Sequence, residues 1–163
     1  MDLQSALQTA IKGEIEGREL YKAAAEKTGD KKAKDVFQML ASEEDSHYQT
    51  LLQMAKDYTE GTEVSVPKLE GPARFEDAES PIFTREFKEK VTDFDMTALS
   101  IGVKLELESE RFYREMAEKA KDKEVKDLFA RLADWEHEHY EYLQSQIGFF
   151  ESYYTQKYSM FRF

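Results

Sequence analysis

The sequence contains an internal repeat with an offset of 92 residues. When residues 14–51 are aligned with residues 106–143 without a gap, 17 of the 38 positions are identical. Four of the identical pairs carry chemically active side chains: Glu14 and Glu106, Tyr21 and Tyr113, Glu44 and Glu136, His47 and His139. Within each copy, apolar residues recur every three or four positions, which is the spacing of one helix face. The repeat therefore predicts that one helical hairpin occurs twice.

The residues between the apolar stripes predict where the helices begin and end. Asp2 is the expected N-cap of the first helix, and Thr28-Gly29-Asp30 supplies a glycine at the helix exit and an aspartate N-cap for the second helix. Asp122 has the corresponding position before the fourth helix, which we expect to end at Gly148. We therefore expect hairpin one at about 2–59 and hairpin two at about 95–147.

A long connection separates the two hairpins. Residues 60–94 contain all three prolines and include a short expected helix at 84–90, and residues 148–163 form an aromatic tail. Two hairpins with short loops and one long crossover are the topology of ferritin-like bundles. We predict one all-α domain over residues 1–163, a four-helix bundle, in which the tail either covers one end of the bundle or makes a dimer contact. We expect a homodimer.

Composition excludes several classes of function. The formal net charge is -11, so nucleic acid and anionic membrane surfaces are not expected partners. No apolar run approaches the roughly 20 residues that span a bilayer, and the N-terminal residues do not resemble a signal peptide. The chain has no cysteine, which excludes disulfides and cysteine-ligated metals. The simplest expectation is a cytoplasmic protein.

The repeated acidic and histidine residues predict a metal site. Glu44 and His47, like Glu136 and His139, are three residues apart, so each pair shares one helix face in register with the apolar stripe. Four carboxylates buried together would repel one another unless cations lay between them. The predicted ligands of two metal ions are Glu14, Glu44, His47, Glu106, Glu136 and His139.

We assign roles to these ligands from their positions in the repeat. Glu44 and Glu136 are the expected bridging ligands, and Glu14 and Glu106 are the expected terminal ligands, one beside each histidine. Oxygen and nitrogen ligands without thiolates suit iron or manganese. Two iron ions are the expected cofactor, and manganese is the alternative.

Other residues near this face have two open interpretations. Tyr21 and Tyr113 either hydrogen-bond a ligating carboxylate or pack as ordinary core aromatics. His137 lies beside the ligand face and is interpreted as a surface histidine. The helical glycines Gly17 and Gly102 indicate close helix approach. Ser109 matches Gly17 in the repeat, and these small residues predict space beside the metals for water, dioxygen or peroxide.

These motifs resemble the rubrerythrin branch of the ferritin-like superfamily over both hairpins. The resemblance implies a non-haem di-iron centre that reacts in the ferrous state with hydrogen peroxide or dioxygen and is then re-reduced. Many rubrerythrins add a rubredoxin domain with a four-cysteine iron site. This chain lacks cysteine, so the expected donor is a separate protein. Rubrerythrins also commonly place another Glu three residues after the third-helix ligand, where this chain has Ser109; Glu110 is a weaker candidate for that role.

Three functions are compatible with the sequence. The first is an oxidoreductase that reduces peroxide or dioxygen with electrons from an external donor. The second is a ferroxidase that serves iron storage or delivery. The third is a bundle with a structural metal that docks a partner through its aromatic tail.

Overall fold

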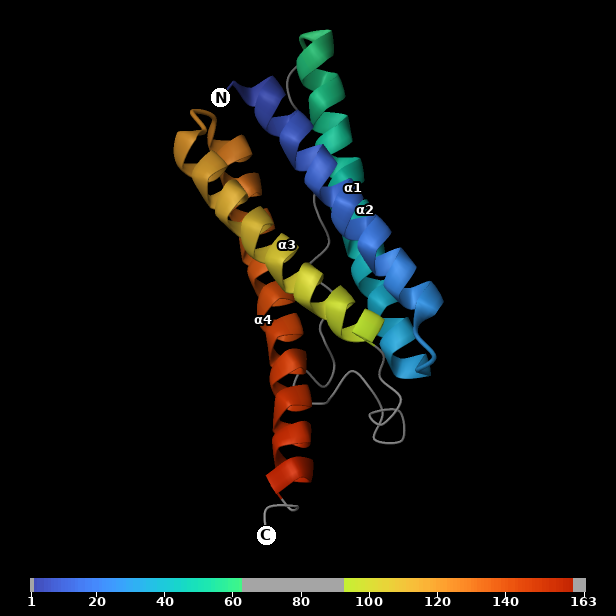
Figure 1. The fold of residues 1–163 in the computed structure, drawn as a ribbon. Helices are drawn as coiled ribbons and strands as arrows, with labels where there is room; N and C mark the ends of the chain where they lie inside the picture. Colours follow the sequence, from blue (N-terminus) through green and yellow to red (C-terminus); the bar gives the residue numbers. More distant parts are fainter. Residues whose placement is uncertain (1, 63–92, 160–163) are drawn as a thin grey trace.

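The computed structural model describes residues 2–62 and 93–159, which form four helices (Figure 1). These are α1 (Leu3–Lys27), α2 (Lys31–Glu60), α3 (Asp93–Lys119) and α4 (Lys123–Ser159). The described residues contain no strand, which confirms the predicted all-α class. The three prolines and the helix expected at 84–90 lie outside the described residues.

Aspartate caps begin three of the helices, as the sequence predicts. The side chain of Asp2 accepts a hydrogen bond from the Ser5 amide at 2.8 Å, and that of Asp30 accepts one from the Ala33 amide at 2.9 Å. Asp122 accepts from two amides at the start of α4. Helix α1 ends at Lys27, and its C-cap is Thr28 in an extended conformation rather than the expected glycine. Gly61, with φ of 68°, caps α2 instead.

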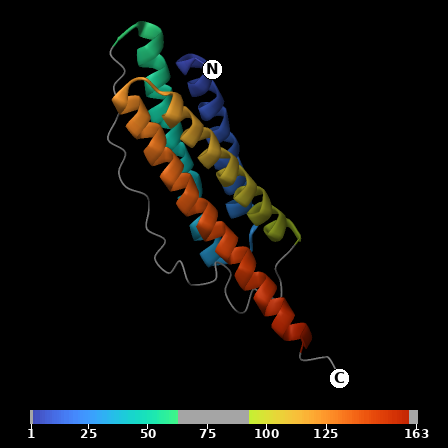
Figure 2. The ribbon, with the colours of Figure 1, turned by 90° about the vertical axis from the view of Figure 1, so that its left-hand side faces the viewer.

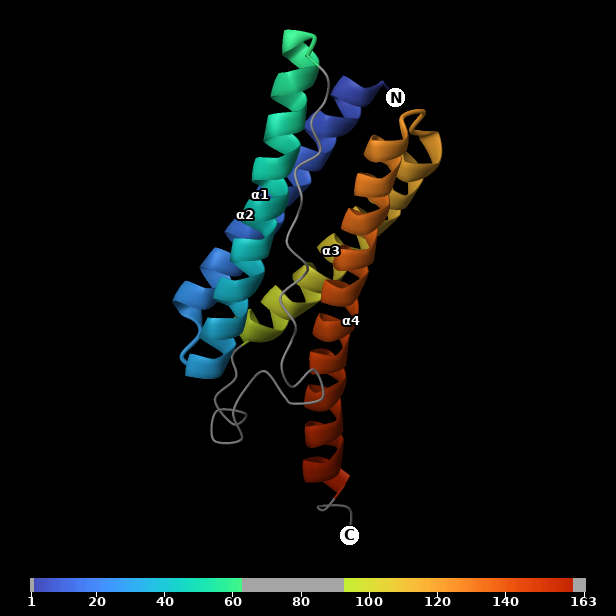
Figure 3. The same ribbon diagram turned by 180° about the vertical axis from the view of Figure 1, so that it is seen from behind.

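The helices pack as two hairpins (Figure 1, Figure 3). Helix α1 lies along α2, helix α3 lies along α4, and the hairpins approach each other most closely through α1 and α3. The backbones of α2 and α4 are farther apart, so long side chains must span the distance between them. Those side chains include most of the predicted ligands.

Helix α4 is longer than expected, and the prediction that it ends at Gly148 is wrong. It continues to Ser159 and extends beyond the ends of the other helices (Figure 2). A glycine inside a helix costs only about 1 kcal/mol relative to alanine. Phe150 is buried, and its ring lies 5.4 Å from that of Tyr154, four residues later. The apolar stripe therefore continues past the glycine and maintains the helix.

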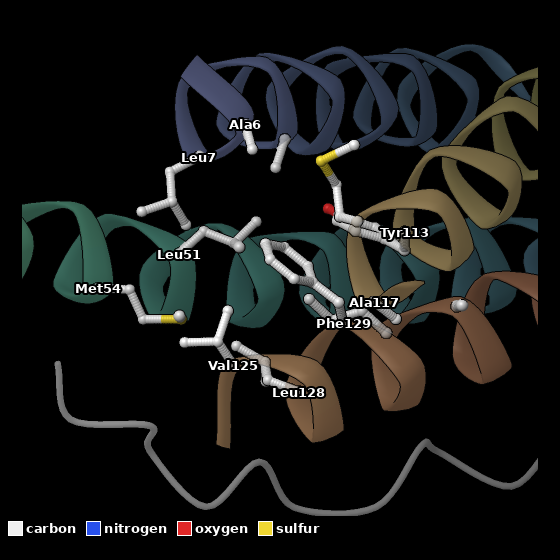
Figure 4. Close-up of a cluster of buried hydrophobic side chains, with 13 residues drawn as sticks. Ala6, Leu7, Leu51, Met54, Tyr113, Ala117, Val125, Leu128 and Phe129 are labelled. Carbon is white, nitrogen blue, oxygen red and sulfur yellow. The ribbon is translucent and has the colours of Figure 1, made fainter. Parts of the chain in front are cut away.

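Two apolar clusters fill the bundle on either side of a polar layer. One cluster contains Tyr21, Phe37, Leu99 and Leu143 and includes Phe150 of the expected tail. The other, shown in Figure 4, contains Leu7, Leu51, Tyr113, Leu128 and Phe129. Each cluster receives residues from all four helices, so both hairpins contribute to both clusters. The polar layer between them holds the predicted ligands.

Candidate metal centre

The structure brings all six predicted ligands together in the middle of the bundle. Glu14 comes from α1, Glu106 from α3, and each of the other two helices contributes a glutamate and a histidine. None of the six side chains is more than about 4% exposed. Such burial is rare for carboxylates unless they are paired with cations or protons.

The six residues form two overlapping groups, and the ligand atoms of each group lie within 4.8 Å of one another. The first group is Glu14, Glu44, His47 and Glu136, and the second is Glu44, Glu106, Glu136 and His139. Glu44 and Glu136 belong to both groups, and each remaining glutamate accompanies one histidine. Each group could hold one metal ion, and two such ions would share the carboxylates of Glu44 and Glu136. The role of these residues as ligands stays a prediction.

The histidines direct their Nδ1 atoms toward the carboxylates. Nδ1 of His47 lies 3.3 Å from Glu14 Oε2 and 3.1 Å from Glu136 Oε1. Nδ1 of His139 lies 3.5 Å from Glu44 Oε1 and 3.6 Å from both Glu106 Oε2 and Glu136 Oε2. The imidazole rings are 6.1 Å apart and nearly parallel. Both rings therefore contribute a nitrogen to the same polar layer.

Several of these buried polar atoms make no good hydrogen bond with one another and would be satisfied by a cation. Within the described part of the chain, Glu14 Oε2, Glu44 Oε1, His47 Nδ1 and both carboxylate oxygens of Glu136 have no hydrogen-bond partner of good geometry. Leaving a buried polar atom unsatisfied costs about 1–3 kcal/mol, and more when the group is charged. Two divalent cations would satisfy these atoms and balance four carboxylate charges.

Without metal, protons must neutralise the site. Burial and the neighbouring carboxylates raise the pKa of Glu44 well above its usual range, and burial raises that of Glu106 to about 8. Burial lowers the pKa of His47, but Glu14 and Glu136 raise it more, to about 10. Burial raises the pKa of Glu136, but the imidazoles of His139 and His47 beside its carboxylate outweigh this and lower it. Metal ions would compete with these protons.

The two tyrosines connect the hairpins. The hydroxyl of Tyr21 on α1 donates to Glu106 on α3, and the hydroxyl of Tyr113 on α3 donates to Glu14 on α1. Burial and the nearby carboxylates raise the pKa of both phenols well above the usual value, so both remain donors. The hydrogen-bonding interpretation therefore holds, and each tyrosine orients a carboxylate of the opposite hairpin.

Two residues that the sequence analysis did not assign to the site lie behind the histidines. The Nε2 atom of His139 lies 2.5 Å from Glu43 Oε2, across the space between α4 and α2. The ring of His47 stacks on Trp135 at a centroid distance of 5.1 Å. Glu43 and Trp135 occupy equivalent positions in the repeat, each immediately before a ligating glutamate. The difference between these equivalent positions was the feature of the sequence that could have identified both residues.

The helical glycines make room for the site, as predicted. A Cβ atom at Gly17 would lie 3.3 Å from the Glu44 carboxylate, and one at Gly102 would lie 3.2 Å from the Tyr21 hydroxyl oxygen. The expected space beside the metals is not at Gly17, because Glu44 fills that volume. A cavity of about 260 Å³ lies instead between α1 and α3, and Gly13, Ser109 and Tyr113 line it.

His137 and Glu110 lie outside both ligand groups. His137 is 42% exposed, and its Nδ1 lies 3.0 Å from Glu110 Oε2. Glu110 also accepts from Arg114 at 2.8 Å, so its carboxylate is already held by two partners. The equivalent positions in hairpin one, Arg18 and Asp45, form an ion pair at 2.7 Å. The surface interpretation of His137 agrees with this pairing, and Glu110 does not replace the additional glutamate.

Each helical hairpin contributes a Glu from its first helix and a Glu-x-x-His from its second helix to one buried site. This arrangement defines a ferritin-like bundle with a carboxylate-histidine site. The rubrerythrin family model matches residues 5–147, and the chain belongs to the rubrerythrin family.

A solved structure supports the fold. It is a hypothetical protein from Pyrococcus furiosus with 29% sequence identity and a TM-score of 0.69, and the match covers 94% of this chain and 92% of that one. No functionally curated protein matches this sequence. Among residues 2–62 and 93–159, no helix is long and apolar enough to cross a membrane.

Proposed function

We propose that this protein is a non-haem di-iron oxidoreductase that reduces hydrogen peroxide or dioxygen with electrons from a separate donor protein. The observation that carries the proposal is the pair of overlapping ligand groups that share Glu44 and Glu136. Family membership supports iron as the metal, with manganese as the alternative. Four carboxylates and two imidazoles match the charge of two ferrous ions and the ligand preference of iron.

The bound iron ions would supply the electrons: reduction of one hydrogen peroxide to two water molecules takes two electrons and two protons, one electron from each ferrous ion. The protein residues hold this chemistry in place. Glu44 and Glu136 belong to both ligand groups and would hold the two ions next to each other. Tyr21 and Tyr113 fix the two remaining carboxylates from the opposite hairpin.

The surroundings favour a small oxidant over a larger substrate. The apolar clusters on both sides of the polar layer exclude bulk water from it. The cavity between α1 and α3 reaches Tyr113, whose hydroxyl donates to Glu14. We propose that peroxide or dioxygen approaches the centre along this side. These 163 residues contain no cysteine and therefore no cysteine-ligated iron site, and we propose that a separate protein supplies the electrons for re-reduction.

Stopped-flow absorbance tests the proposal. The protein is loaded anaerobically with two ferrous ions per chain and mixed with hydrogen peroxide or with oxygenated buffer. We expect a fast rise in the near-ultraviolet absorbance of ferric iron, and its reversal by an added reductant. Glu44→Ala and His139→Ala should lose the fast phase, while His137→Ala should retain it. Oxidation no faster than that of ferrous iron in buffer would contradict the proposal.

One observation favours a second candidate, a ferroxidase that passes oxidised iron on to storage or delivery. Ser109 stands where many relatives have an additional glutamate, so the ligand set is limited to four Glu and two His. Light scattering separates the candidates. A hollow particle of many subunits that accumulates ferric iron would support storage, and a monomer or dimer that turns over peroxide would support the oxidoreductase.

A further inference from the structure

The two ligand groups have identical ligands but different residues behind their histidines. His139 has a carboxylate behind it, because its Nε2 lies 2.5 Å from Glu43 Oε2. His47 has an indole behind it, because Trp135 stacks on the ring with an interplanar angle of 17°. Since Glu43 and Trp135 are equivalent in the repeat, the same position supplies an acceptor to one imidazole and an apolar ring to the other.

Glu43 affects the metal-facing side of His139 through the imidazole ring. When Nε2 carries the ring proton, its N–H donates a hydrogen bond to the Glu43 carboxylate, and the lone pair of Nδ1 then faces Glu44, Glu106 and Glu136. Such a hydrogen bond also makes the ligating nitrogen more basic. Loss of an outer partner of this kind typically lowers metal affinity by about 10- to 100-fold.

Trp135 cannot do the same for His47. Its indole nitrogen is a donor only, and its stacked ring offers packing without a hydrogen-bond acceptor. Stacking restricts the orientation of the imidazole but does not select the ring nitrogen that carries the proton. The stacked indole therefore packs against His47 without giving it the hydrogen bond that Glu43 gives His139.

We infer that the two metal positions are unequal: the position of Glu106 and His139 fills first and holds its metal more tightly, and the position of Glu14 and His47 fills second and releases first. The inference rests on the proposed metal centre. Glu43 is then a positioning residue for the metal at His139. Trp135 gives His47 no hydrogen-bond acceptor, so the metal at His47 exchanges more easily. Tyr113, which lines the α1–α3 cavity, contacts Glu14 of the exchangeable position.

Nitrogen NMR of the histidine rings tests the inference without any turnover. The chain has three histidines, and His137 belongs to neither ligand group, so it serves as an internal reference. Zn²⁺ is the probe because it is diamagnetic and has no redox chemistry. We expect Nδ1 of His139 to shift with the first equivalent of Zn²⁺ and Nδ1 of His47 to shift with the second.

Exchanging the residues behind the histidines should change the order. Glu43→Ala should weaken the His139 position by about 10- to 100-fold, and Glu43→Gln, which retains an acceptor oxygen, should recover part of that loss. Trp135→Glu should tighten the His47 position and bring the two affinities together. Trp135→Phe is the matched control, because it retains an aromatic ring and should leave the order unchanged.

The outcomes separate this inference from the proposed function. If neither His47 nor His139 shifts with Zn²⁺, the metal centre itself is wrong. If both shift together in the wild-type protein, or if His47 shifts first, two metals bind but the inference is overturned. It is also overturned if Glu43→Ala weakens both positions equally.

Discussion

The two halves of the candidate centre agree in their predicted metal ligands and differ in the residues behind those ligands. Glu14 and His47 match Glu106 and His139 in type, in burial and in their relation to the shared carboxylates. The residues behind these ligands do not match, because Glu43 in the first hairpin corresponds to Trp135 in the second. The surface pairs beside the site also differ. In hairpin one the first helix carries the basic residue Arg18 opposite Asp45, and in hairpin two the first helix carries the acidic residue Glu110 opposite His137. The repeat thus fixes where the predicted ligands lie, and the residues behind them are where the two halves differ.

The largest expected effect comes from a carboxylate that both halves share. Glu136→Ala removes a ligand from both groups, so we expect bound metal to fall from two ions per chain to less than one. Glu14→Ala removes a ligand from one group only and should leave about one ion per chain. Elemental analysis after dialysis measures both. Equal losses in the two variants would show that the carboxylate of Glu136 is not shared.

The pH dependence of the metal-free protein reports titrating groups from both halves of the centre. The folded-state pKa of Glu106 is raised from 4.5 to about 8, and that of His47 from 6.5 to about 10. In both cases the folded protein holds a proton that the unfolded chain has released, so stability must fall as pH rises through these windows. Glu136, whose pKa is lowered, is ionised in both states above pH 6 and adds no slope there.

We therefore expect the melting temperature of the metal-free protein to decrease from pH 5 to pH 10. His47→Gln should reduce the decrease above pH 7, and Glu106→Gln should reduce it below pH 8. Differential scanning calorimetry with and without metal measures this, and bound metal should flatten the curve because it replaces the protons. A metal-free protein that becomes more stable with increasing pH would contradict these pKa shifts.

Each buried tyrosine, Tyr21 or Tyr113, should affect metal affinity at the ligand group whose terminal glutamate lies on the other hairpin. Tyr21→Phe removes the donor to Glu106 and should weaken the His139 position, and Tyr113→Phe removes the donor to Glu14 and should weaken the His47 position. The expected loss is about 10-fold, at the lower end of the range for outer partners of metal ligands. Competition with a coloured chelator gives the two affinities. Tyr142→Phe, a buried tyrosine outside both groups, is the control.

The smallest expected effect comes from two glycines on the same helix. Gly13→Ala and Gly17→Ala should each improve helix propensity by about 1 kcal/mol. At Gly13 the new Cβ has only an ordinary contact, 3.9 Å from Ser109 Oγ, so the metal-free protein should become more stable and metal binding should not change. At Gly17 the Cβ meets the Glu44 carboxylate at 3.3 Å, so metal affinity should fall severalfold. Equal metal affinity in the two variants would show that Glu44 can move without loss of binding.

The repeat made the fold and the position of the site predictable from sequence. A residue that occurs twice, at helical spacing and in register with the apolar stripe, had to face the same interior in both hairpins. The tyrosine partners were not predictable to the same extent, because the crossing between hairpins depends on how α1 and α3 pack. The end of α4 was missed because Gly148 was interpreted as a stop, although Phe150 and Tyr154 continue the buried stripe beyond it.

Glu43 and Trp135 were missed for a different reason. Each lies one residue before a ligand, where a helix presents a neighbouring face, and each reaches a histidine of the other hairpin. Sequence spacing within one helix does not report such a contact between hairpins. The difference at this position was nevertheless present in the alignment of the two copies.

Anomalous X-ray diffraction at the iron edge, on crystals of protein loaded anaerobically with ferrous iron, tests the central claim most directly. We expect two adjacent iron peaks in the polar layer, one contacted by Glu14 and His47 and the other by Glu106 and His139, with Glu44 and Glu136 between them. An iron peak elsewhere in the bundle, or no peak between these carboxylates, would contradict it.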